Sequence, residues 1–163
     1  MHYIIRVMNI EAEVGQILRK RKLTLAIAES CTGGLISSRI TDSNGSSDYF
    51  LMGIVAYSNR IKENILGISG KLLRKYGAVS KQVAFEMAKG VQLLAGTDIG
   101  IGVTGIAGPT GGTNKKPIGL VYIAAVAGKK RIIKKLHFKG ARQDIKLQAS
   151  EAALDLIKRC ARS

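Results

Sequence analysis

The sequence lacks tryptophan, and only 5% of its 163 residues are aromatic, so the core must be built from aliphatic side chains. Its two cysteines, Cys31 and Cys160, have no metal-ligand spacing and indicate no disulfide framework, which is typical of a reduced, cytoplasmic protein. The longest apolar run, 118–128, is too short to span a bilayer. The N-terminal segment has no long apolar core, which argues against a signal peptide.

Histidine is almost as scarce. We expect His2 to lie in a frayed terminus and His137 to be a partly buried residue of a late strand. A Ser-His-Asp triad is therefore disfavoured. Any nucleophilic serine in this chain must take its base from lysine, tyrosine or a carboxylate.

Acidic residues are also few, with 11 Asp and Glu against 26 Lys and Arg, for a net charge of +15. Such an excess indicates either attraction to phosphate or a solvated basic surface. The basic runs 19–22 and 129–131 contain no aromatic residues, whereas single-strand nucleic-acid binders usually place stacking side chains beside the charge. Glu29 and Asp48 have no metal-site spacing, so we expect no metal.

Hydrophobic periodicity predicts helices that alternate with strands. Asn59, Ser69 and Ser80 are expected to cap helices, and Leu94 is expected on the buried face of the helix that Ser80 begins. The expected helices cover 9–21, the segment after Gly34 to about 40, 59–66, 69–75, 80–95 and 145–160, and the expected strands cover 23–28, 49–57, 98–103, 118–126 and 131–138.

This alternation, which ends in a β-hairpin, predicts an α/β fold. We expect one three-layer domain over residues 1–163, with a mixed sheet flanked by helices. Ligands of such sheets bind beyond the carboxyl ends of the strands. Three segments rich in small polar residues follow strands, at 29–34, 57–62 and 104–113, and we expect them to converge.

Ser30 lies between a strand and a helix start at Gly33-Gly34. A strand-to-helix turn exposes its side chain and directs free N–H groups toward an oxyanion or a phosphate, which favours Ser30 as a nucleophile. The alternative is a Ser/Thr cap with glycines for packing. Cys31 is a rival nucleophile whose pKa the same helix start would lower, or else a small buried residue.

Tyr57 and Lys62 are the candidate bases. Lys62 falls in the first turn of the helix that Asn59 is expected to cap, where the positive helix end and burial would lower its pKa. It is otherwise a surface lysine. Thr104-Gly105 ends another strand, and there it either donates to a substrate oxygen or forms a turn. Arg142 suits either a phosphate clamp or a solvated helix end.

Five motifs occur in order along the chain, and together they resemble the CinA C-terminal domain family, the nicotinamide-nucleotide amidohydrolases also called PncC. The resemblance covers residues 10–160. The motifs are Ala28-Glu29-Ser30-Cys31-Thr32-Gly33-Gly34, Gly45-Ser46-Ser47, Tyr57-Ser58-Asn59 with Lys62, Gly77-Ala78-Val79-Ser80, and Thr104-Gly105-Ile106-Ala107-Gly108-Pro109.

The resemblance implies a cytoplasmic, cofactor-free enzyme that converts nicotinamide mononucleotide and water to nicotinate mononucleotide and ammonia, in pyridine nucleotide salvage. It implies Ser30 as nucleophile and Lys62 and Tyr57 as the groups that activate it. The substrate-binding positions it implies or allows are Thr32, Gly33, Gly34, Ser47, Thr104, Gly105 and Arg142. The helix-start N–H groups of Gly33 and Gly34 are expected to hold the oxyanion. We expect a nucleotide ligand and a homo-oligomer, and neither a membrane nor nucleic acid as partner.

Two other functions compete with this one. The first is a non-catalytic nucleotide-phosphate binding module in which Ser30 and Thr32 are only ligands. The second is a nucleic-acid-binding protein, motivated by the net charge of +15. Release of ammonia from nicotinamide mononucleotide separates the enzyme from both.

Overall fold

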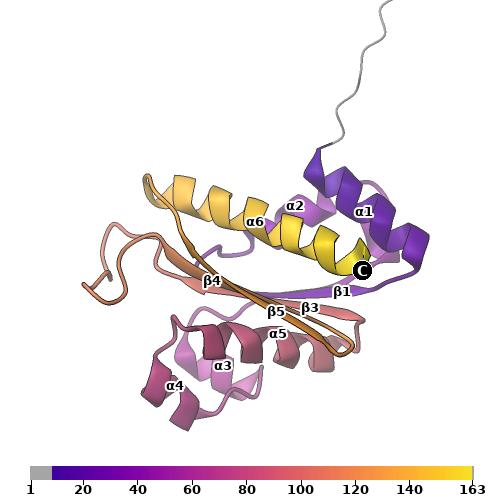
Figure 1. The fold of residues 1–163 in the computed structure, drawn as a ribbon. Helices are drawn as coiled ribbons and strands as arrows, with labels where there is room; N and C mark the ends of the chain where they lie inside the picture. Colours follow the sequence, from indigo (N-terminus) through magenta and orange to yellow (C-terminus); the bar gives the residue numbers. More distant parts are fainter. Residues whose placement is uncertain (1–8, 163) are drawn as a thin grey trace, which may run out of the picture.

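The computed structural model describes residues 9–162, so His2 lies outside the described residues. A five-stranded sheet lies between two layers of helices (Figure 1). Along the chain the elements are α1 (Ile10–Arg21), β1 (Leu25–Glu29), α2 (Leu35–Thr41), the short 3-10 helix η1 (Ser46–Asp48), β2 (Phe50–Val55), α3 (Asn59–Asn64), α4 (Gly70–Tyr76), α5 (Lys81–Ala95), β3 (Ile99–Gly105), β4 (Leu120–Ala127), β5 (Lys130–His137) and α6 (Arg142–Arg162).

The strands lie in the order β2-β1-β3-β4-β5. β1 pairs in parallel with both β2 and β3, whereas β4 and β5 are antiparallel to their neighbours. Helices α1, α2 and α6 cover one face and α3, α4 and α5 the other (Figure 1). The expected three-layer α/β fold, with its mixed sheet and late hairpin, is confirmed.

Large and small residues alternate along the central strands, and the two kinds face opposite sides of the sheet. On β1 and β3 the large side chains, such as Ile27 and Ile101, pack in the core beneath α1, α2 and α6. The intervening positions are small because α5 lies close to the sheet. A Cβ atom on Gly100 or Gly102 would clash with the α5 backbone. β1 is buried at every position and β3 at all but its last, as expected of strands covered by helices on both faces.

Most element positions agree with the sequence expectations, and the differences have local causes. Ser58, not Asn59, caps α3, because the Ser58 side chain accepts the Ile61 N–H. Ser80 caps α5 as expected, but Ser69 makes no side-chain bond to α4. Leu94 was wrongly placed on the buried face of α5, since half of its surface is exposed.

Two further differences concern the end of the chain. His137 is exposed rather than partly buried, because it lies on the edge strand β5 and its alternate residues face solvent. Helix α6 begins at Arg142, earlier than expected, because the Asp144 carboxylate accepts the Ala141 N–H and closes the first turn. Arg142 is therefore helical, and its direction is set by α6.

Candidate active site

Ser30 directly follows β1, whose neighbours β2 and β3 lie on opposite sides of it in the sheet. From β1 the chain crosses to β2 on one side, while β3 lies on the other, and crevices at such points bind ligands. The Ser30 N–H donates to Val103 O at 2.9 Å, which continues the pairing with β3 by one residue. The side chain is 9% exposed. Sheet pairing thus holds the Ser30 backbone rigidly where its hydroxyl reaches a crevice.

Glu29 organises the turn after Ser30. Its fully buried carboxylate accepts bonds from the Thr32 hydroxyl at 2.6 Å and from the N–H groups of Gly34 and Ile36 at 3.1 Å each. Its other oxygen accepts from Ser37 N at 2.8 Å and Ser37 Oγ at 2.7 Å. An anion at a helix start is stabilised by the helix dipole. Here that anion belongs to the protein.

This arrangement corrects three expectations. The Gly34 N–H and the Thr32 hydroxyl are occupied by Glu29, and the Gly33 N–H donates to Ser30 O at 3.1 Å. The expectation that the Gly33 and Gly34 N–H groups hold an oxyanion is wrong, because those donors are already used. Thr32 is completely buried and was wrongly expected to bind substrate. The sequence motif serves to shape the turn.

Cys31 is a poor nucleophile in this setting. Burial raises the pKa of its thiol to about 12, although nearby Lys62 and Arg142 act in the opposite direction. The expectation of a lowered pKa at the helix start is wrong, because desolvation of a thiolate outweighs the field of a helix start whose anion site is filled by Glu29. Cys31 is the small buried residue of the alternative hypothesis.

Lys62 contacts Ser30 directly. Its Nζ lies 3.1 Å from Ser30 Oγ, 2.8 Å from Ala56 O and 3.1 Å from Tyr57 O. Only 1% of Lys62 is exposed, and burial lowers the pKa of its amine. A neutral amine has two N–H donors and one lone pair. As an ammonium, Lys62 donates to Ser30 Oγ and to both carbonyls. Once it is deprotonated, the two carbonyls can take both of its N–H donors, and the lone pair is left to accept the Ser30 proton.

Tyr57 and Arg142 form the mouth of the site. Arg142 Nη2 donates to the Tyr57 hydroxyl at 3.0 Å, and Nη1 donates to Gly108 O at 2.7 Å. The Tyr57 side chain is 60% exposed. Its carbonyl, rather than its phenol, holds Lys62. The direct Lys62–Ser30 contact makes a relay through the phenol unnecessary.

Thr104 and Gly105 lie at the end of β3. The Thr104 hydroxyl donates to Ala78 O at 2.8 Å, so its lone pairs remain as acceptors. Gly105 has no space for a side chain, since a Cβ atom would lie 2.7 Å from Val121 Cγ2 and 2.8 Å from Leu120 O. Thr104 therefore offers an acceptor to the crevice, and Gly105 allows β4 to approach.

Ser47 does not reach this site. It is exposed within η1, which precedes β2 and so lies at the amino end of that strand, whereas the crevice lies at the carboxyl ends. Its expected role in binding substrate in this cavity is wrong for a single chain. The Gly45-Ser46-Ser47 motif forms a turn.

The convergent loops enclose a cavity of about 340 Å³. Among the described residues no carboxylate lines it, and the Arg142 guanidinium makes it cationic. The sequence assigned no role to Ala78-Val79, which lie within a quoted motif and complete one wall. The loop after Ala107 belongs to segment 104–113, which was expected to converge here. The lining residues are Ser30, Cys31, Tyr57, Lys62, Ala78, Val79, Thr104, Gly105, Ile106, Ala107, Gly108, Thr110, Gly111 and Arg142.

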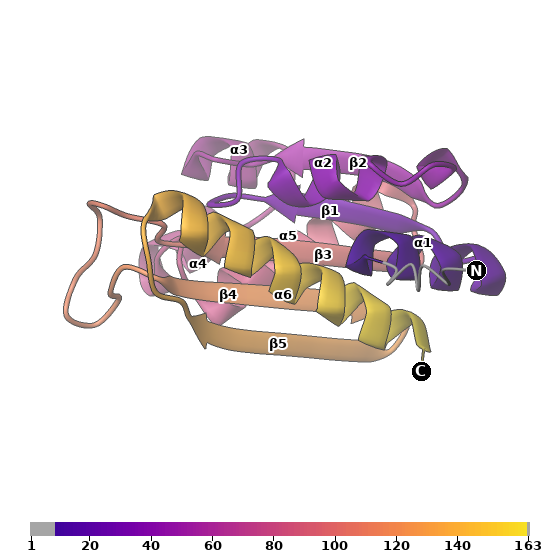
Figure 2. The same cartoon turned by 90° about the horizontal axis from the view of Figure 1, so that it is seen from above.

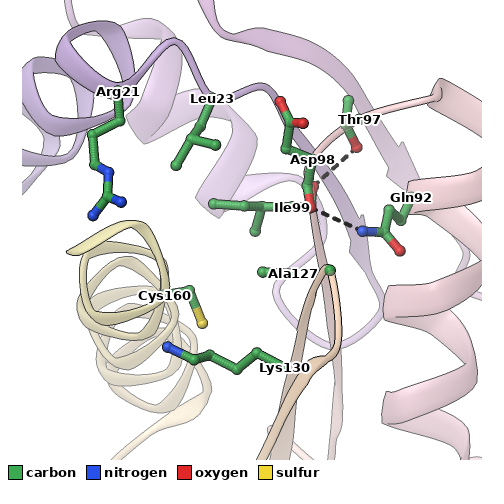
Figure 3. Close-up of a pocket in the computed structure, with 10 residues that line it drawn as sticks. Arg21, Leu23, Gln92, Thr97, Asp98, Ile99, Ala127, Lys130 and Cys160 are labelled. Carbon is green, nitrogen blue, oxygen red and sulfur yellow. Dashed lines mark hydrogen bonds between the residues drawn. The ribbon is translucent and has the colours of Figure 1, made fainter. Parts of the chain in front are cut away.

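A second cavity, of about 490 Å³, lies at the opposite end of the sheet (Figure 3). Arg21, Asp98, Lys130 and Cys160 are among its lining residues. Within residues 9–162, no cluster of His, Cys, Asp and Glu could hold a metal ion. No helix in the same range combines the length and apolar character needed to cross a bilayer.

Residues 7–161 match the family model described as the CinA C-terminal domain. The chain belongs to that family. It is 49% identical over 151 residues to a CinA-like protein of Kosmotoga olearia, covering 93% of this chain and 37% of that relative. The chain thus spans little more than a third of the length of the curated relatives it matches.

Solved structures of CinA proteins share the fold over nearly their whole length. The competence/damage inducible protein CihA of Agrobacterium tumefaciens superposes with a TM-score of 0.88 at 35% identity, covering 93% of this chain and 94% of that one. A competence-damaged protein (CinA) superfamily protein of Klebsiella pneumoniae gives 0.90 at 29% identity, covering 94% and 96%.

Proposed function

We propose that this CinA-family chain hydrolyses the carboxamide of nicotinamide mononucleotide to nicotinate mononucleotide and ammonia. One observation carries the proposal: the buried Lys62 amine lies 3.1 Å from Ser30 Oγ, and two carbonyls occupy its remaining donors. Such a pair generates an alkoxide without histidine. A cationic cavity free of carboxylates suits a phosphorylated amide.

The reaction follows from this pair. Lys62 takes the Ser30 proton as Oγ attacks the carboxamide carbon, and the resulting ammonium returns that proton to the departing nitrogen. Ammonia leaves, and an ester to Ser30 remains. Lys62 then deprotonates a water molecule that attacks the ester and releases the carboxylate product and the Ser30 hydroxyl.

The oxyanion requires donors other than those first expected. The Cys31 N–H follows the nucleophile directly, and no oxygen of the described residues accepts it. In strand-to-helix nucleophile turns, the N–H after the nucleophile commonly forms half of an oxyanion hole. We assign this role to Cys31 N–H. Thr104, an acceptor, would face the substrate amide nitrogen.

The test is release of ammonia from nicotinamide mononucleotide, with the product identified by chromatography. Wild-type protein should turn over, and Ser30→Ala should lose roughly 10³-fold or more in kcat. Ser69→Ala, which removes an exposed serine hydroxyl that makes no cap bond and does not line the cavity, is the matched control and should retain most activity. Absence of ammonia with wild-type protein would overturn the proposal.

The same experiment addresses the non-catalytic alternative. Tight binding of the mononucleotide without ammonia release would identify a nucleotide-phosphate binding module. Nicotinamide riboside extends the test, because it has the same carboxamide without the phosphate. If the cationic cavity binds phosphate, the riboside should be a poor substrate.

A further inference from the structure

The basic residues of α6 fall into two groups. Those of its carboxyl-terminal half each lie within 4.0 Å of a carboxylate, in the pairs Lys158–Glu13, Arg159–Asp155 and Arg162–Glu13. Those of its first two turns, Arg142 and Lys146, have no carboxylate within that distance among the described residues. The helix thus leaves two cations without a carboxylate partner at one end, where Arg142 donates only to the neutral groups Gly108 O and Tyr57 OH.

This placement is unfavourable for the protein alone. Arg142 and Lys146 are four residues apart on one helix face, where like charges repel. Both also lie near the amino terminus, whose partial positive charge disfavours cations. The first turn also contains Asp144, but its carboxylate accepts the Ala141 N–H and forms no ion pair with either cation. Two unpaired cations at this position are expected of a site that receives an anion.

Lys146 lies beside the nucleophile turn. A Cβ atom built on Gly33 would lie 3.5 Å from Lys146 Nζ, and the Gly33 N–H itself donates to Ser30 O. The Lys146 side chain is half-buried. The first turns of α6 lie at the end of the sheet where β1 and β3 finish (Figure 2). Arg142, one turn earlier, already lines the cavity.

We propose that Lys146 and Arg142 together bind the phosphate of the substrate, so that Lys146 determines specificity for 5′-phosphorylated amides. The inference rests on the proposed function. Arginine offers a planar fork and lysine a compact charge, a combination suited to a phosphate dianion. Gly33 has a φ of +61°, which favours glycine, and its turn passes within ordinary contact distance of the Lys146 amine.

Lys146→Met tests the specificity directly, since methionine keeps the stem and removes the charge. We expect the KM for nicotinamide mononucleotide to rise about tenfold, with kcat changed less than about twofold. The kcat/KM for nicotinamide riboside should stay constant. Lys129→Met removes the same charge in the β4–β5 turn, at the other end of the sheet. It should not change kcat or KM for either substrate.

Binding of ribose 5-phosphate to Ser30→Ala protein, measured by calorimetry, separates this inference from the proposed function. Adding Lys146→Met should weaken that binding about tenfold, whether or not wild-type protein releases ammonia. Equal binding with and without Lys146→Met would overturn the role of Lys146. An equal loss of ribose 5-phosphate affinity on adding Lys129→Met would also overturn it, because net charge alone would then account for the effect.

Discussion

A cavity lies at each end of the sheet. The two cavities contain similar residue types, but their polar groups have different hydrogen-bond partners. Each cavity has basic side chains and a buried cysteine, and near each a carboxylate accepts bonds from the backbone: Asp98 at one end and Glu29 at the other. At the amino ends, Asp98 accepts bonds from Thr24 N and Oγ1 at 2.8 Å each, and Gln92 donates to Asp98 O at 2.9 Å (Figure 3). Polar groups there join strands to each other.

At the carboxyl ends, the carboxylate of Glu29 lies behind the turn, and a hydroxyl and an amine face the crevice. The larger cavity, of about 490 Å³, has no nucleophile–base pair among its lining residues, and the cavity of about 340 Å³ has one. The comparison shows that cavity volume does not identify the candidate active site. A short contact between a buried amine and a hydroxyl does.

The largest effect should come from Lys62→Arg. Guanidinium keeps the charge but cannot act as a base, so kcat should fall by roughly 10²-fold to 10⁴-fold. The matched change in the other cavity, Lys130→Arg, should leave kcat unaltered. Near-normal turnover of Lys62→Arg would show that Lys62 anchors substrate and does not take the proton.

The pH profile sharpens the same comparison. Burial lowers the pKa of Lys62 from the ordinary lysine value of 10.5, and only the neutral amine accepts the Ser30 proton. Activity should therefore rise with pH through an ionisation below 10.5. Rate profiles of kcat/KM from pH 6 upward would measure it, and the residual activity of Lys62→Arg should lack this ionisation.

Glu29→Ala and Asp98→Ala compare the two anchoring carboxylates. Glu29 holds three backbone N–H groups and two hydroxyls, so its loss should lower the free energy of unfolding by about 3 kcal/mol and misplace Ser30. Asp98→Ala should cost about 1–2 kcal/mol and spare kcat. Urea unfolding and turnover of the folded variants measure both. A comparable loss of turnover in the two variants would contradict the distinction.

A smaller effect concerns stability and pH. The pKa of Lys62 is lower in the folded protein than in the unfolded chain, so the unfolded chain binds more protons between the two values. The free energy of unfolding should therefore rise as pH increases through the folded-state pKa toward 10.5. Lys62→Met should remove this rise, which urea unfolding at a series of pH values would detect.

The smallest effects should come from the cysteines, one in each cavity. Burial raises the pKa of Cys31 to about 12 and also raises that of Cys160. Cys31→Ala and Cys160→Ala should each change kcat less than about twofold. Iodoacetamide should modify both thiols only after unfolding. A strong loss of kcat in Cys31→Ala but not in Cys160→Ala would indicate Cys31 as a nucleophile.

Much of the fold could be predicted from local patterns. Segment 23–28 predicted a short buried strand, and the hairpin was predicted from the strands 118–126 and 131–138 joined at Gly128-Lys129. Helix caps were less predictable, because Ser58 and Asn59 are equally suitable by type. Only the direction of the chain as it leaves β2 decides that Ser58 accepts the Ile61 N–H.

The members of the candidate site were predicted only in part, since Thr32, Gly33, Gly34 and Ser47 do not line the cavity. Ser30, Tyr57, Lys62, Thr104 and Arg142 do line one cavity. Whether an N–H group is free for substrate depends on what else accepts it, and at Gly34 the acceptor is Glu29. A motif of small residues is compatible with both outcomes.

The sequence by itself determined the residue types that can react and the order of strands and helices, because periodicity and turn chemistry act between neighbours in the chain. Tertiary structure decided which groups meet. Lys62 reaches Ser30 because β1 and β2 pair in parallel, with Ala56 N bonded to Glu29 O at 2.8 Å. Lys146 reaches Gly33 because α6 returns across the sheet. Burial then sets the chemistry, since desolvation lowers the pKa of an amine and raises that of a thiol, and desolvation depends on neighbours that are distant in the chain.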